Sequence, residues 1–237
     1  MIAAAPVSAL SQPDLWPEPC AAIAAIDALD ERAAAARACA EAAQASAGPI
    51  DPRLIELYHH LGGVVAAAQG PKAALAALPF QRRAYRAAER ALGADAPRTG
   101  RAALDHARGW ILTGRCEGHD PRVLSLLEAA QRGFVGAPQA ERSGAMRAIA
   151  AAYADVLAYE AAEAALLAHG EAERFAALDW ERLARWRHRR GALPEARAAY
   201  EAALAAAPPA RDALRMRRSL RLVLFELGDL EALQALD

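Results

Sequence analysis

Apolar residues recur every three or four positions along most of the chain, which is the spacing of one face of an α-helix. The pattern is clearest from Trp180 to Pro208, where Gly191 separates two apolar stripes. The stripes consist of Trp180, Leu183 and Ala184, and of Ala196, Tyr200 and Ala203. Glycine relaxes the backbone at a turn and proline ends a helix, so this stretch predicts two helices that pack their stripes together as a hairpin.

The residues of this hairpin stand at the offsets of a known repeat signature, which combines large and small apolar residues, a turn glycine and a final proline. They are Trp180, Leu183, Ala184, Gly191, Ala196, Tyr200, Ala203 and Pro208. The hairpin therefore resembles a tetratricopeptide repeat (TPR), with Arg187 in place of one expected aromatic residue. The resemblance implies an all-α fold of antiparallel helical hairpins stacked as a TPR-like α-solenoid. In that fold the first helices of the hairpins line a concave groove that binds a partner protein.

The pattern recurs at the family period of about 34 residues. One period before the clear hairpin, Met146 fills the place of its first apolar residue, whereas Leu157 stands at the turn in place of glycine. We therefore expect a hairpin over residues 144–169 and a shortened terminal hairpin over 211–236 that turns at Gly228. The resemblance is clearest over residues 144–237, and the last hairpin is expected to cap the array.

The upstream part of the chain also predicts helices, which are separated by glycine and proline pairs. The expected helices cover residues 21–47, 52–68, 72–78, 81–92, 102–113 and 121–134. We expect Gly48 and Pro49 to stop the first, Gly62 and Gly63 to interrupt the second, and Asp120 to cap the last. The predicted division is an extended leader over 1–20, degenerate hairpins over 21–140, and TPR-like repeats with the capping hairpin over 141–237.

The composition agrees with a helical chain. Roughly three residues in ten are alanine, which loses the least free energy on entering a helix. Aromatic residues make up 5% of the chain, so its helices are expected to pack closely through small side chains. With 237 residues the chain is long enough to bury a sizeable core.

The three cysteines, Cys20, Cys39 and Cys116, are far apart and form no CxxC pair. We interpret them as free thiols in a reducing compartment. The first residues lack a basic segment, and no stretch approaches the roughly twenty uninterrupted apolar residues of a membrane span. The sequence therefore predicts a cytoplasmic protein with no membrane partner.

Catalytic and metal-binding motifs are not found in the sequence. There is no HExxH, GxSxG or phosphate-binding GxxxxGK[ST] pattern. His59 and His60 are adjacent and point to different sides of a helix, so they do not share a metal ion. We assign no catalytic residue, no metal site and no cofactor. The alternative of an enzyme or small-molecule sensor stays open, with a site in the N-terminal helical region near Tyr58, His59, His106 or Cys116.

Basic side chains stand between the packing stripes of the first helices of the clear hairpins. The groove residues that we expect to bind a partner are Arg147, Glu181, Arg182, Arg185, His188, Arg189, Arg215 and Arg218. Arginine pairs with carboxylates through two parallel hydrogen bonds, so an acidic peptide of a partner protein is the expected ligand. The chain has no asparagine, so the two-carboxylate clamp of the TPR family is not carried over. The favoured function is a non-enzymatic scaffold, adaptor or assembly chaperone.

Other interpretations of these features stay open. Arginines on an exposed helix also brace it, as Arg185 does if it pairs with Glu181, for a few tenths of a kcal/mol. Nucleic-acid binding through the arginine stripe is disfavoured by a net charge of −1 and by Lys72 as the sole lysine. Homo-oligomerisation through the C-terminal end is a further alternative. Its apolar residues are Leu222, Leu224, Phe225 and Leu227.

Overall fold

The structure is a computed structural model that describes residue 20 and residues 22–168 and 175–236. Within these residues it is all-helical, with no β-strand, as predicted. A short 3-10 helix (Ile23–Ala25) precedes the α-helices. In chain order these are α1 (Leu29–Ala47), α2 (Arg53–Ala66), α3 (Gly70–Leu92), α4 (Pro97–Leu112), α5 (Pro121–Phe134), α6 (Gln139–Asp155), α7 (Tyr159–Leu167), α8 (Ala177–Arg189), α9 (Leu193–Ala205), α10 (Ala210–Leu227) and α11 (Leu230–Gln234). The leader predicted over 1–20 lies, apart from Cys20, outside the described residues.

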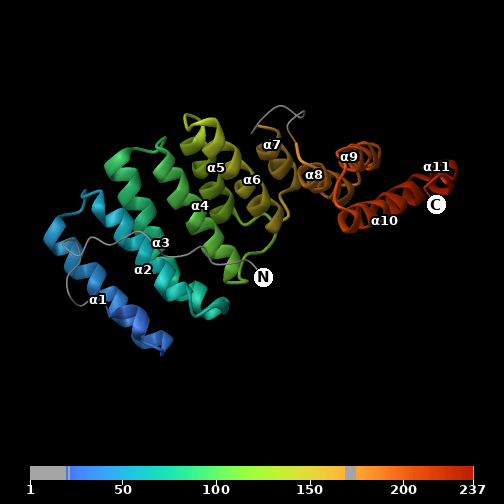
Figure 1. Cartoon of the computed structure of the whole chain (residues 1–237). Helices are drawn as coiled ribbons and strands as arrows, with labels where there is room; N and C mark the ends of the chain where they lie inside the picture. Colours follow the sequence, from blue (N-terminus) through green and yellow to red (C-terminus); the bar gives the residue numbers. More distant parts are fainter. Residues whose placement is uncertain (1–19, 21, 169–174, 237) are drawn as a thin grey trace.

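Consecutive helices pack against each other, so that the helices form a row from α1 to α11 (Figure 1). The closest-packed neighbours are α2 with α3, α3 with α4, α4 with α5, and α8 with α9. Buried residues form two hydrophobic cores, which meet within α4: Ala102 belongs to the first core, and Ala103 and Leu104 belong to the second. The division of the chain near residue 140 stays a prediction.

The predicted interface between α8 and α9 is present. Leu183 and Ala184 of α8 and Ala203 of α9 are completely buried, and Tyr200 of α9 is 1% exposed. Trp180 is partly buried and contacts Phe175 edge-on, with 5.3 Å between the ring centroids. Tyr200 is therefore buried in an interface whose other members include the small residues Ala184 and Ala203. Small side chains let the axes of α8 and α9 approach closely.

The turns that follow α6, α8 and α10 share one backbone conformation. Gly191 and Gly228 have φ angles of 77° and 73°, in the left-handed region that glycine adopts without strain. Leu157, one predicted period before Gly191, has a φ angle of 60°. The turn therefore keeps its geometry where the sequence lacks glycine, at the steric cost that a branched side chain carries in this region.

Several boundaries in the upstream part differ from the predictions. Helix α1 begins at Leu29 instead of residue 21. Gly62 and Gly63 do not interrupt α2, which continues through both glycines. A Cβ atom at Gly62 would meet Phe80 of α3 at 3.5 Å, an ordinary van der Waals distance. The two helices expected over 72–78 and 81–92 are one helix, α3, which continues through Pro79. Burial of Leu78 and Phe80 on either side of Pro79 offsets the roughly 3 kcal/mol that an interior proline costs.

Other local signals were predicted correctly. Gly48 ends α1 with a φ angle of 80°. The side chain of Asp120 caps α5 by accepting a hydrogen bond from the backbone N–H of Arg122. The helix expected over 121–134 is present with the same bounds as α5. These signals depend only on neighbouring residues, which explains why the sequence alone was sufficient to predict them.

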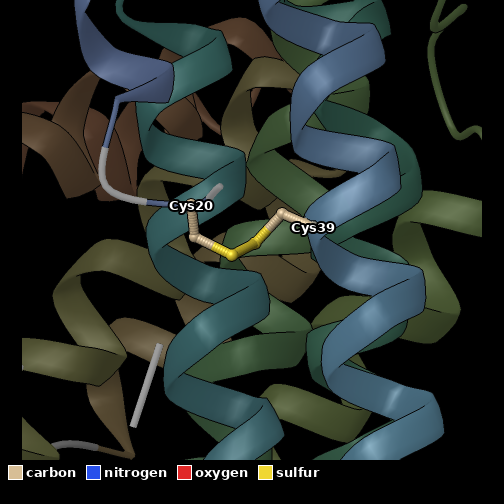
Figure 2. Close-up of a disulfide and its surroundings, with 2 residues drawn as sticks. All are labelled: Cys20 and Cys39. Carbon is tan, nitrogen blue, oxygen red and sulfur yellow. A yellow bond between two sulfur atoms is a disulfide. The ribbon is translucent and has the colours of Figure 1, made fainter. Parts of the chain in front are cut away.

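Cys20 and Cys39 form a disulfide, which contradicts the prediction of free thiols at these positions. Their Cα atoms are 5.5 Å apart, and both residues are buried. Figure 2 shows how the bond ties the segment before α1 to the middle of α1. Cys116 is free. The sequence did not reveal this pairing, because the two cysteines are nineteen positions apart and only the turn before α1 brings Cys20 back along the helix.

The disulfide bears on where the protein resides. Disulfides persist in oxidising compartments and are rare in a reducing cytoplasm. In the part of the chain that the structure describes, no helix has both the length and the apolar character needed to cross a membrane. The cytoplasmic location therefore stays a prediction, and the cysteine pair favours an oxidising compartment instead.

The contact between α4 and α5 depends on two glycines. A Cβ atom at Gly133 would lie 2.6 Å from the Cα of Gly100, whereas a Cβ at Gly144 of α6 would meet nothing within 4 Å. We expect Gly133→Ala to destabilise the protein by about 1–3 kcal/mol because α4 and α5 must separate. Gly144→Ala should stabilise it by about 0.5–1 kcal/mol, because alanine favours the helix. Urea unfolding of both variants measures the difference, and equal effects would contradict the close contact.

Removal of the disulfide should destabilise the first core. Cys39→Ser is expected to lower the free energy of unfolding by about 2–4 kcal/mol, because the unfolded chain gains freedom. Cys116→Ser serves as the control and should change it by less than about 0.5 kcal/mol. A thiol assay on the unfolded, unreduced protein checks the bond directly. It should find one free thiol per chain, since Cys116 alone is unpaired, and three would contradict the pairing.

Candidate functional site

The eight predicted groove residues lie on three alternate helices. Arg147 is on α6, the residues from Glu181 to Arg189 are on α8, and Arg215 and Arg218 are on α10. Ion pairs connect α8 to both α6 and α10. The structure therefore places the three helices that carry these residues next to one another through these pairs. Several of these charged residues form ion pairs with other residues of the same chain.

Asp179 connects α6 to α8. It is 2% exposed, and its carboxylate accepts hydrogen bonds from Arg147 Nε at 3.1 Å and from Arg182 Nη1 at 3.2 Å. A buried carboxylate needs such partners, because an unpaired charge in the interior is strongly destabilising. Two of the predicted groove arginines thus hold a buried acid of their own chain.

Glu181 connects α8 to α10. Arg215 donates two parallel hydrogen bonds to it, from Nε to Oε1 at 2.8 Å and from Nη2 to Oε2 at 2.7 Å. These bonds lower the pKa of Glu181 below its ordinary value, against the opposing effect of burial, and the pKa of Arg215 is raised in turn. Glu181 was expected to face the groove. Instead it is 3% exposed, because Arg215 of the next hairpin covers it.

His188 also contacts α10, through an Nε2 to Oε2 distance of 2.8 Å to Glu226. The three groove residues that remain are Arg185, Arg189 and Arg218, and all three are exposed. Among the described residues, none of the three forms an ion pair within 4.0 Å. The expected basic groove is therefore reduced to three available arginines beside neutralised pairs.

The partner acids Asp179 and Glu226 were missed by the sequence analysis, although a signal was present. Arg147 and Asp179 are 32 residues apart, and Glu181 and Arg215 are 34 residues apart. Both separations are close to the repeat period of about 34 residues. A search of the sequence for opposite charges about 34 residues apart would therefore have predicted these two ion pairs.

Arg187, which replaces an expected aromatic residue of the repeat signature, also has a structural role. Its Nη2 donates to Glu163 of α7 at 2.6 Å, and Arg190 bonds the other carboxylate oxygen of Glu163. Arg197 of α9 similarly bonds Asp229, which caps α11. These ion pairs connect α8 and the turn after it to α7, and they connect α9 to the N-terminus of α11.

The candidate residues of the N-terminal region do not form one site. His59 lies 3.1 Å from Asp105 of α4. His106 is buried, and burial together with the nearby Arg82 and Arg86 lowers its pKa to about 4. Burial raises the pKa of the Cys116 thiol, which makes it a poorer nucleophile. No group of three metal-binding side chains occurs among the described residues.

The C-terminal residues expected to support self-association differ in exposure. Leu224 is 2% exposed and belongs to the second core. Leu227 is half-buried against the same core. Leu222 and Phe225 are exposed, at 50% and 66%. Two of the four residues expected to form an apolar surface are therefore at least half buried.

No protein-family model matches the chain, and no curated protein matches it. The TPR resemblance therefore stays a prediction, and the function is argued from the chain's own residues.

The Glu181–Arg215 pair should give the stability a specific pH dependence. Because the pKa of Glu181 is lowered by folding, its charge stabilises the protein above the ordinary pKa of about 4.3, and this stabilisation is lost as the pH falls through the lowered pKa. Glu181→Gln should cost about 1–3 kcal/mol at neutral pH, and its difference from wild type should shrink as the pH falls through the lowered pKa of Glu181.

Urea unfolding from about pH 7 to about pH 3 measures this difference. The control is Glu201→Gln, since Glu201 is an exposed residue whose partner Arg197 is one turn away on α9. That variant should lose less than about 1 kcal/mol. A difference between wild type and Glu181→Gln that does not vary with pH would contradict the role assigned to the charge of Glu181.

Proposed function

We propose that the chain is a non-enzymatic scaffold, a TPR-like α-solenoid that binds an acidic segment of a partner protein. The binding surface is the exposed side of α8 and α10. Scaffold, adaptor and assembly chaperone all use such a surface, because an extended row of helices offers a long area for one segment of a partner.

Two features support the repeat architecture. The turns at Leu157, Gly191 and Gly228 share a left-handed residue and recur at about one period. The ion pairs from α6 to α8 and from α8 to α10 have nearly the same sequence separation. Arg147 of α6 and Glu181 of α8 are 34 residues apart, and each pairs with the next helix but one, with the charges reversed between the two pairs. This recurrence supports the proposed repeat array.

The proposed binding site is supported by a difference among the arginines of α6, α8 and α10. Some of them form ion pairs within the chain, and others are exposed without such a pair among the residues that the structure describes. Arg147, Arg182 and Arg215 are occupied by buried acids of the chain. Arg185, Arg189 and Arg218 are exposed. Arg185 and Arg189 are one turn apart on α8, so both guanidinium groups can contact carboxylates that are spaced along one extended peptide.

The test is binding of a fluorescent peptide of glutamates, measured by anisotropy with the folded chain. Arg185→Glu with Arg189→Glu should weaken binding at least about tenfold, because two attractive contacts become repulsive. Arg182 is left unchanged because it holds Asp179. The matched control is Arg37→Glu with Arg115→Glu, two exposed arginines away from α8 and α10, which should change the affinity less than about twofold.

Circular dichroism first establishes that all variants are equally helical. A pull-down from native lysate with the same set of proteins then identifies a natural partner retained by the control and lost by the α8 variant. Equal loss in both pairs of variants would show a non-specific effect of net charge and overturn the proposal. Tighter binding of an oligonucleotide, with a steep loss of affinity in salt, would favour the nucleic-acid alternative.

A further inference from the structure

A pocket of about 200 Å³ lies where the end of α1 meets α2 and α3. Four arginines of α3 line it, and the other polar residues of its wall are Gln44 and Tyr58. The arginines are Arg82, Arg83, Arg86 and Arg90. Leu54 and Ala87 add an apolar part to the wall. The pocket is far along the chain from the arginines of α8 and belongs to the first core region.

The polar groups in the wall present mainly hydrogen-bond donors. A guanidinium group has five N–H donors and no acceptor. The hydroxyl of Tyr58 donates to Oε1 of Gln44 at 3.1 Å, which occupies the acceptor of this amide and leaves its NH₂ group available. A ligand that pairs with these donor groups must therefore supply several hydrogen-bond acceptors.

The arginines also have little internal compensation. Arg82, Arg86 and Arg90 are spaced one turn apart on α3, an arrangement in which like charges repel. Glu41 is mostly exposed and lies 3.9 Å from Arg83 Nη2, beyond hydrogen-bond distance. Nη1 of Arg83 is buried, and no described group accepts a hydrogen bond from it. A buried guanidinium nitrogen without an acceptor is rare in folded proteins.

We propose that this pocket binds a small oxyanion with at least two negative charges. A phosphate group and a compound with several carboxylates share the required chemistry, since both offer clustered oxygen acceptors that match the guanidinium fork. The apolar part formed by Leu54 and Ala87 can accommodate a short carbon frame beside the anionic group. The site is independent of partner binding on α8 and α10, and it gives the chain a small-molecule ligand.

The test is isothermal titration calorimetry of the full chain with inorganic phosphate and with citrate, at constant ionic strength in chloride. One saturable site per chain is expected. Arg83→Gln with Arg86→Gln should weaken it at least about tenfold. Arg185→Gln with Arg189→Gln makes the same change in net charge on α8 and should alter the affinity less than about twofold. The tighter of the two anions identifies the phosphate or the carboxylate form of the ligand.

A second variant keeps the test decisive if the first fails to fold. Gln44→Glu places a carboxylate among the four arginines while it keeps an acceptor for Tyr58. We expect it to raise the melting temperature and to abolish the stabilisation by phosphate or citrate. The proposal is overturned if the wild type binds neither anion, if both arginine pairs weaken binding equally, or if Gln44→Glu still binds as wild type does.

Discussion

Close approach of neighbouring helices through alanine and glycine is the constraint on which the rest of the structure depends. Ala77, Ala103 and Ala184 are completely buried, each in a different helix, and Gly100 faces Gly133 where α4 meets α5. An alanine removes little apolar surface from water, so an interface of this kind gains its free energy from many short contacts. A helix in this row therefore requires a well-fitted neighbour on each side, and a single substitution that widens one contact affects the whole interface.

Ion pairs between hairpins add a second level of specificity to these uniform apolar faces. Alanine surfaces fit one another in several registers, whereas a buried carboxylate tolerates only the register that brings its arginine within reach. Asp179 and Glu181 each select the position of a neighbouring first helix in this way. These pairs occupy Arg147, Arg182 and Arg215 within the chain, whereas other arginines of α8 and α10 are exposed to solvent.

Local signals were sufficient to predict much of the fold, while contacts between distant residues were not accessible from one sequence. The cap at Asp120 and the turn glycines depend on a few adjacent residues. The continuity of α3 through Pro79 depends instead on the burial of Phe80 against other helices, and the pairing of Cys20 with Cys39 depends on a turn of the chain before α1. For the candidate site, the basic residues were predicted but their buried acidic partners were not, since the groove was inferred from one helix at a time. The pocket on α3 was missed because its wall comes from three helices.

Helix α4 contributes to both hydrophobic cores, and this has a consequence for how the chain can be divided. The second core runs without interruption from Ala103 to Leu224 and includes Phe134 and Ile149 on either side of the break between α5 and α6. A fragment that begins after this break would expose the face of α6 that α5 covers. Cooperative unfolding units are thus expected to follow this packing and not the predicted repeat boundaries. A stable fragment of the C-terminal part is expected to require α4 and α5 as well.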